Sequence, residues 1–256
     1  MGPCWYINVR RVDSLEVGII NEYNKIISVS VWYSVLFMSF SDQLLDDGAE
    51  IWAAQKAHPF VTELAAGSLD KSAFRHWIEQ DYRYLLDYAR LFAIAGAKAR
   101  DEQTMTDLLS IAHSTLDNEM DLHREFAAEY GISRPELEQV EKSPTCEAYT
   151  SFLLRTAYEG SIAEISAALY PCGQGFLDIG ERAAELAEDE HQYTPWIETY
   201  TSEEFRNVVE LMRDFVDRCG DRYPGEHEKM RDAFLTSARF EYQFWEMAYT
   251  QEQWEV

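Results

Sequence analysis

The segment DKSAFRHWIEQDYRYLLDYARLFAIAGAKAR, from Asp70 to Arg100, sets the expectation for the whole fold. Apolar residues recur in it at intervals of three and four, which is the period of one face of an α-helix. Asp70 precedes the run and can cap it by accepting a hydrogen bond from a backbone N–H of the first turn. We therefore expect a long helix over 71–100, with a bend or break near Asp81.

The same period continues on both sides of this segment, from Ser41 almost to the end of the chain. No stretch of alternating hydrophobicity indicates a sheet, and no repeat of fixed period occurs. These patterns predict an all-α bundle of about eight to ten helices in a single domain over 38–256. The other expected helices cover 42–58, 102–130, 143–159, 161–187 with a local break at Pro171 and Gly173, 195–200, 202–219 and 226–249.

The chain is strongly acidic, with 46 acidic and 22 basic residues and a net charge of −24. Such a surface repels phosphate backbones, so we expect no nucleic-acid partner. This composition is typical of proteins from the high-salt cytoplasm of halophilic archaea, where the Debye length falls to about 3 Å at 1 M salt. We expect a cytoplasmic protein from such an organism.

The four cysteines show no C-x-x-C spacing, which argues against a zinc site and against a thioredoxin-like pair. In a chain of 256 residues a disulfide framework is also not expected. Reduced thiols in a cytoplasm fit this pattern best.

Residues 1–37 differ from the rest, because three acidic and three basic residues leave them without net charge. Their apolar run, 26–40, is interrupted by serines and falls short of the ~20 residues that a membrane span needs. No small-residue cleavage site follows it cleanly, as a signal peptide would require. We expect 1–37 to be a non-native or disordered extension and Met38 to be the biological start. A native protein whose intact mass begins at Met1 would contradict this expectation.

Asp81, Tyr84 and Tyr88 lie at positions i, i+3 and i+7 and therefore share one face of the expected helix. A carboxyl group on an otherwise apolar and phenolic face must be hydrogen-bonded, or else it is desolvated at a cost. The pattern fits a binding site and equally fits a capping Asp beside core tyrosines. Both interpretations stay open from the pattern alone.

Glu119 and His123 are four residues apart and could face one metal ion, as in the iron sites of helical bundles. Such sites combine Glu-x-x-His motifs from two helices, which this single pair does not supply. A structural Glu–His pair is the favoured interpretation, and we expect no metal ion.

The run Ala167-Ala168-Leu169-Tyr170-Pro171-Cys172 places one thiol directly after a proline in an apolar helical segment. Proline removes a backbone hydrogen bond and bends a helix. Gly173 and Gly175 weaken the helix further, by ~1 kcal/mol each relative to Ala. A single Cys is more often a buried inert thiol, but these neighbours indicate a site where shape outweighs helix stability.

Glu241 lies three and four residues before Phe244 and Trp245 in the last expected helix. A carboxyl group among aromatic side chains tends to have a raised pKa, the property of a general acid at neutral pH. A carboxylate at the bundle surface with the aromatic rings turned inward is an equally good interpretation of the pattern.

Seven stretches, taken together and in order, resemble the thiaminase II (TenA) family, whose members have the haem-oxygenase-like helical fold. The resemblance runs from Met38 to about Trp254. Their order and family-like intervals make the resemblance specific. The stretches are 57–61, 80–85, 119–126, 143–151, 168–172, 191–200 and 241–249.

The resemblance implies hydrolysis of 4-amino-5-aminomethyl-2-methylpyrimidine to the hydroxymethylpyrimidine used in thiamin salvage, with thiamin cleavage as a related activity. It implies that Cys172 is the nucleophile that adds to the pyrimidine ring and that Glu241 is the acid/base for the departing amine and the incoming water. It further implies no cofactor and a homotetramer. The substrate-binding residues that it implies are Asp81, for the ring amino group and a ring nitrogen, and Tyr84, Tyr149, Tyr200 and Phe244, for orientation and packing.

One departure concerns Gly173-Gln174-Gly175, where family members commonly carry aromatic residues. It predicts a wider or more polar pocket wall. Two other functions stay open as alternatives. One is a non-catalytic pyrimidine-binding or regulatory protein of the same fold, and the other is a haem or di-iron protein that uses Glu119 and His123.

Overall fold

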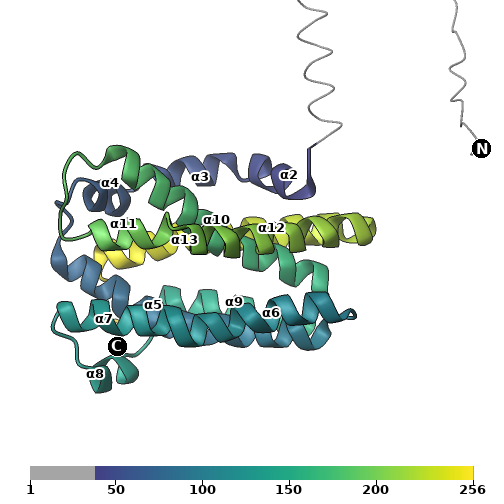
Figure 1. Ribbon diagram of the computed structural model, residues 1–256, viewed down its shortest axis with the longest axis horizontal. Helices are drawn as coiled ribbons and strands as arrows, with labels where there is room; N and C mark the ends of the chain where they lie inside the picture. Colours follow the sequence, from purple (N-terminus) through teal and green to yellow (C-terminus); the bar gives the residue numbers. More distant parts are fainter. Residues whose placement is uncertain (1–37, 256) are drawn as a thin grey trace, which may run out of the picture. The chain divides into compact units, whose positions relative to one another are not determined.

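The computed structural model describes residues 38–255 (Figure 1). Over these residues the chain forms helices and turns without any β-strand, which confirms the all-α prediction. Residues from Ser39 onward form one compact unit, whereas the predicted extension at 1–37 lies outside the described residues. In the described part of the chain, no helix is both long enough and apolar enough to cross a membrane.

Twelve α-helices occur in the described residues, more than the eight to ten expected. Short interruptions divide several of the expected segments. In chain order the helices are α2 (Phe40–Asp47), α3 (Ala49–Lys56), α4 (Pro59–Ala65), α5 (Lys71–Lys98), α6 (Glu102–Ser114), α7 (Met120–Glu129), α8 (Arg134–Gln139), α9 (Pro144–Glu159), α10 (Ile162–Leu186), α11 (Thr194–Tyr200), α12 (Glu203–Arg222) and α13 (His227–Thr250), with a π-helical turn η1 (Thr115–Glu119) before α7 and a 3-10 turn η2 (Pro224–Glu226) before α13.

Local chemistry accounts for most helix ends. Asp70 caps α5 as predicted, because its carboxylate accepts a hydrogen bond from the Ser72 N–H at 2.7 Å. Ser161 and Glu164 form a reciprocal capping box at the start of α10. Gly131 follows α7 with a φ of +74°, a left-handed conformation that favours glycine.

The long helices α5 and α10 organise the bundle. Helix α10 packs against α9, α11, α12 and α13, and α5 packs against α6, α7, α9 and α13. Figure 1 shows α2, α3 and α4 along one side, α10 to α13 in the middle and α5, α6, α7 and α9 on the other side. Side chains where these helices meet are buried, among them Tyr84 of α5, Tyr149 of α9 and Glu241 of α13.

The prediction of a single helix over 42–58 was wrong in detail. Gly48 separates α2 from α3, and Pro59 begins a further helix as well as ending one. His58 caps this third helix, because its Nδ1 accepts a hydrogen bond from the Phe60 N–H at 3.1 Å. Proline suits the first turn of a helix, where its missing N–H would have no intrahelical partner.

The expected breaks near Asp81 and at Pro171 were also wrong. Helix α5 is continuous because Asp81 is buried in a side-chain pair instead of capping a new helix. Helix α10 continues through Pro171, although this residue has no N–H to donate. Hydroxyl groups from two other helices bond to carbonyl oxygens of α10 in this turn, as described below.

The segment expected as one helix over 102–130 contains the π-helical turn η1 between α6 and α7. Such turns are rare and often lie at functional sites, because the extra residue shifts the direction of the side chains. Here the turn places Thr115 and Glu119 in the lining of a cavity that also contains Cys172.

Candidate active site

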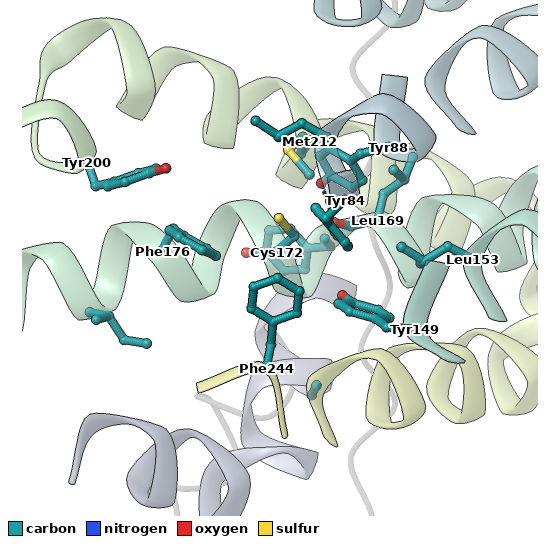
Figure 2. Close-up of a cluster of buried hydrophobic side chains, with 14 of the residues drawn as sticks. Tyr84, Tyr88, Tyr149, Leu153, Leu169, Cys172, Phe176, Tyr200, Met212 and Phe244 are labelled. Atoms are coloured by element: carbon teal, nitrogen blue, oxygen red, sulfur yellow. Dashed lines mark hydrogen bonds between the residues drawn. The ribbon is translucent and has the colours of Figure 1, made fainter. Parts of the chain in front are cut away.

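Cys172 lies on α10 and lines an internal cavity together with residues of α5, α6, η1, α11 and α12. Only 9% of the surface of this residue is exposed. Figure 2 shows the thiol among the side chains of Phe176, Phe244, Tyr84 and Met212. The thiol therefore lies among aromatic rings and the thioether of Met212.

The turn of α10 that contains Pro171 is bonded to two other helices. The Tyr88 hydroxyl of α5 donates to the Leu169 carbonyl at 2.9 Å, and the Ser237 hydroxyl of α13 donates to the Ala168 carbonyl at 2.7 Å. These bonds stabilise a turn that proline weakens. They also hold Cys172 in a defined position relative to α5 and α13.

Glu241 lies on α13, one turn after Ser237, with 2% of its surface exposed. The Tyr149 hydroxyl oxygen of α9 is 2.5 Å from Glu241 Oε1, and this hydroxyl donates to Glu241 when the carboxyl group is ionised. Burial raises the pKa of Glu241 to about 8, with the hydrogen bond from Tyr149 opposing the shift and the charge of Asp81 adding to it. This geometry excludes the surface-carboxylate interpretation and supports the interpretation that predicted a raised pKa.

Asp81 lies on α5 and lines the cavity, and its Oδ2 is 2.5 Å from Nε2 of His123 on α7. The other ring nitrogen of His123 donates to the Glu119 carbonyl oxygen at 2.8 Å. Burial lowers the pKa of His123, but the hydrogen bond to Asp81 and the negative charge of Asp81 outweigh this effect and raise it. His123 therefore fixes the position of the Asp81 carboxyl group at the cavity.

The four remaining candidate residues are aromatic and lie near Cys172 or along the cavity. Tyr84 packs against Tyr149 and Phe244, with ring centroids 5.1 and 5.7 Å apart. Tyr200 lines the cavity from α11 and packs against Phe176 at 4.8 Å. Three of the seven candidate residues therefore line the cavity, namely Asp81, Cys172 and Tyr200. The other four pack against one another beside Cys172: Tyr84, Tyr149, Glu241 and Phe244. The buried Tyr84 hydroxyl makes no hydrogen bond to an oxygen or nitrogen atom of the described residues, and the group that it interacts with is the Cys172 thiol. A buried hydroxyl of this kind needs an explanation, and a polar ligand supplies one.

The Gly173-Gln174-Gly175 departure does not make the pocket wall more polar. A Cβ atom on Gly173 would lie 2.7 Å from Met212 Sδ, so the Met212 side chain takes the space that a larger residue would use. Gln174 is engaged elsewhere, because it accepts from the Tyr170 hydroxyl and donates to Asp178. The wall beside Cys172 is formed by a flexible thioether.

The resting thiol is protonated. Burial raises the pKa of Cys172 well above its ordinary value, and the charges of Glu241 and Asp81 raise it further, against a lowering effect of Tyr84 and Tyr88. A thiol with a raised pKa needs a proton acceptor when it attacks. The site is thus suited to concerted proton transfer and not to a pre-formed thiolate.

The candidate site residues predicted from the sequence did not include Ser237. Tyr88 was considered only as part of the face of Asp81, and Glu119 and His123 only as a structural pair or a metal site. His123 shares a buried face of α7 with Met120 and Phe126, and a histidine on an apolar face was the available signal. Burial raises the pKa of Glu119 to about 7, lowered in part by His123 and raised by Asp81. No group of three or more His, Cys, Asp or Glu side chains in residues 38–255 could hold a metal ion.

Comparison with known proteins places this geometry in context. Residues 45–251 match the TENA/THI-4/PQQC family. The chain is 40% identical over 220 residues to "Aminopyrimidine aminohydrolase" of Halalkalibacterium halodurans, covering 85% of this chain and 98% of that protein. It is 36% identical over 218 residues to the protein of the same name from Bacillus subtilis, covering 85% and 92%.

Solved structures agree with these matches. The TenA homologue from P. horikoshii superposes with a TM-score of 0.78 at 29% identity, covering 83% of this chain and 99% of that one. A domain with a heme oxygenase-like fold from Shewanella denitrificans gives a TM-score of 0.63 at 13% identity, covering 91% and 94%, a likeness of fold alone. The predicted resemblance and the predicted haem-oxygenase-like fold are both confirmed.

Proposed function

Because the chain belongs to the TENA/THI-4/PQQC family, we propose that it is an aminopyrimidine aminohydrolase of thiamin salvage. Its substrate is 4-amino-5-aminomethyl-2-methylpyrimidine, and water replaces the amine on the exocyclic methylene to give hydroxymethylpyrimidine and ammonia. Thiamin cleavage is a second activity of the same site. The observation that supports the proposal is that Cys172 and Asp81 line one cavity, with the buried Glu241 close enough to Cys172 for its charge to act on the thiol.

Asp81 orients the ring in this proposal. His123 engages Oδ2 of Asp81, so Oδ1 can accept a hydrogen bond from the amino group of the pyrimidine. The hydroxyl of Tyr84 can bond to a polar atom of the ring or to the sulfur of Cys172. Phe244 and Tyr200 supply flat apolar walls, which suit an aromatic ligand.

Covalent catalysis then divides the substitution into two steps. The sulfur of Cys172 bonds to a ring carbon while the thiol hydrogen passes to the ring. The C–N bond of the exocyclic methylene breaks as Glu241 gives its proton to the departing amine. Glu241, now a carboxylate, takes a proton from water as the water oxygen bonds to the methylene. Release of the sulfur with a proton from the ring restores both groups.

The proposal is tested with aminopyrimidine, its formylated form and thiamin, each assayed with the wild type and with Cys172→Ala. We expect the wild type to release hydroxymethylpyrimidine and the variant to be slower by at least about 10³-fold, as for loss of a nucleophile. Far-UV circular dichroism checks that both proteins are folded. Equal turnover by the two proteins would exclude covalent cysteine catalysis.

The same experiment separates the enzyme from a non-catalytic binding protein. A binding protein would bind aminopyrimidine in a calorimetric titration, yet would release no product with any of the three compounds. That outcome would overturn the proposed function.

We propose further that the protein is a cytoplasmic homotetramer, in keeping with the resemblance described above. Light scattering in dilute buffer and in molar salt tests the assembly. A particle of four times the chain mass is expected, and a monomer in both buffers would contradict it.

A further inference from the structure

Ser237, Tyr149 and Glu241 form a continuous chain of oxygen atoms behind the pocket. The Tyr149 hydroxyl oxygen is 2.5 Å from Glu241 Oε1 and 2.8 Å from Ser237 Oγ, and Ser237 Oγ is 2.7 Å from the Ala168 carbonyl oxygen. Ser237 is fully buried, and Tyr149 is 1% exposed. These oxygen atoms therefore need hydrogen-bond partners within the protein, because water does not reach them.

The number of hydrogen atoms in this chain depends on the state of Glu241. The Ala168 carbonyl can only accept, so the single hydroxyl hydrogen of Ser237 is used there. The contact between Tyr149 and Ser237 then needs the hydrogen of Tyr149. The contact between Tyr149 and Glu241 in turn needs a hydrogen on the carboxyl group. Three contacts are complete only when Glu241 is a carboxylic acid, because a carboxylate leaves two hydrogens for three contacts.

We propose that Ser237 is a positioning residue that, through Tyr149, holds Glu241 in its protonated form in the resting enzyme. Ser237 does this by accepting the hydrogen that Tyr149 would otherwise donate to a carboxylate. The inference rests on the proposed role of Glu241 as the proton donor to the departing amine. Ser237 does not line the cavity, and its proposed role is to keep Glu241 protonated before the amine departs.

The hydrogen bonds of Tyr149 change as Glu241 loses and regains its proton during the reaction. When Glu241 has given its proton to the amine, Tyr149 turns its hydrogen to the carboxylate, and the contact with Ser237 loses its hydrogen. When water returns a proton to Glu241, the contact is restored. No proton leaves the chain toward Ser237, so the serine acts through Tyr149 and never touches the substrate.

Other titratable groups also surround Glu241. The charge of Asp81 on α5 opposes ionisation of Glu241. Among the described residues, the Tyr149 hydroxyl lies within hydrogen-bond distance of the Glu241 carboxyl group. Ser237 therefore acts on Glu241 by determining where the Tyr149 hydroxyl hydrogen points. The titratable groups that couple to Glu241 are Asp81, Tyr84 and Tyr88 on α5, Tyr149 on α9 and Cys172 on α10.

The test is the pH dependence of kcat/KM, whose alkaline limb reports loss of the Glu241 proton in the free enzyme. Ser237→Ala frees Tyr149 to donate to the carboxylate, which favours ionisation. We expect the alkaline limb to move to lower pH by roughly one unit, the scale of one hydrogen bond. Ser237→Cys, whose sulfur is a weaker acceptor, is expected to give a smaller shift in the same direction, and Ser237→Thr is expected to keep the wild-type limb.

Ser166→Ala is the matched control, because Ser166 is another buried serine that donates to a backbone carbonyl, that of Ala163, and lies outside the cavity lining. The alkaline limb of the Ser166→Ala profile should lie at the same pH as that of the wild type. An alkaline limb that stays in place or rises in folded Ser237→Ala, or in Ser237→Cys if the alanine variant does not fold, overturns the inference.

Failure of the inference is distinguishable from failure of the proposed function. If the wild type turns over aminopyrimidine and only the limb fails to move, the Ser237 inference alone is lost. If the wild type is inactive, the infrared C=O band of a protonated carboxyl still follows Glu241, with Glu241→Gln as the reference. That band must then disappear at lower pH in Ser237→Ala than in the wild type, and equal titration in both would overturn the inference.

Discussion

Cys172 and Glu241 share a property that separate inspection of each residue does not reveal: both are held uncharged at neutral pH. Burial raises the pKa of the thiol well above its ordinary range and that of the carboxyl to about 8. Two negative charges in one buried site would repel each other, so the neutral pair is the stable resting state. The third carboxyl or thiol group of the site, that of Asp81, is paired with His123 instead.

The raised pKa of Glu241 makes the stability of the fold depend on pH. In the unfolded chain Glu241 loses its proton above the ordinary pKa of 4.5, whereas in the folded protein it keeps the proton up to a pKa of about 8. Between these two values the folded state binds one more proton than the unfolded state. The free energy of unfolding should therefore fall as pH rises within this window, by about 1.4 kcal/mol per unit for one proton. Glu119, with a pKa of about 7, and His123, with a raised pKa, contribute with the same sign.

We expect Glu241→Gln to reduce this slope by about 1.4 kcal/mol per unit between pH 5.5 and 7.5, measured by urea unfolding. Glu210→Gln, at an exposed position on α12, is the control and should keep the wild-type slope. Parallel slopes for wild type and Glu241→Gln would show that Glu241 does not titrate in this range.

At the scale of the element, α10 shows how a weakened helix becomes useful. Pro171 and two glycines lower its intrinsic stability, yet it continues from Ile162 to Leu186. Tyr88 and Ser237 bond to its carbonyl groups. Helix propensity alone predicted a break here, and contacts with α5 and α13 override that propensity.

The two glycines on α10 should respond differently to alanine. A Cβ on Gly173 meets Met212, which lines the cavity, whereas the nearest atom to a Cβ on Gly175 is Gln55 Oε1 at 3.7 Å. Gly175→Ala should stabilise the fold by about 1 kcal/mol with an unchanged KM. Gly173→Ala should gain less stability and change KM several-fold, because it displaces Met212 into the pocket. Thermal unfolding and steady-state kinetics measure both, and equal KM values would contradict the assigned position of Met212.

At the scale of the whole molecule, the net charge of −24 governs behaviour in salt. Self-repulsion among surface carboxylates destabilises the compact state, and salt screens it. The fold therefore combines a strongly acidic exterior with an interior in which two key groups are neutral.

We expect Tm to rise as NaCl increases from 0.1 to 1 M, since the Debye length falls from about 10 to about 3 Å. Each kcal/mol gained should raise Tm by roughly 2–4 °C for a chain of this size. Differential scanning calorimetry measures this, with an equal osmolality of sucrose to separate screening from solvent exclusion. A Tm that is independent of NaCl would show that surface repulsion is negligible.

The sequence by itself determined the helical class, most helix ends, the family resemblance and the identity of the candidate residues. These depend on local properties: the period of apolar residues, capping by Asp70 and Ser161, and motif order along the chain. Only the tertiary structure decided between the open interpretations of Asp81 and Glu241, found the His123 partner of Asp81 and kept α10 continuous through Pro171. Each of these depends on contacts between helices far apart in sequence, about which the spacing of residues within one helix carries no information.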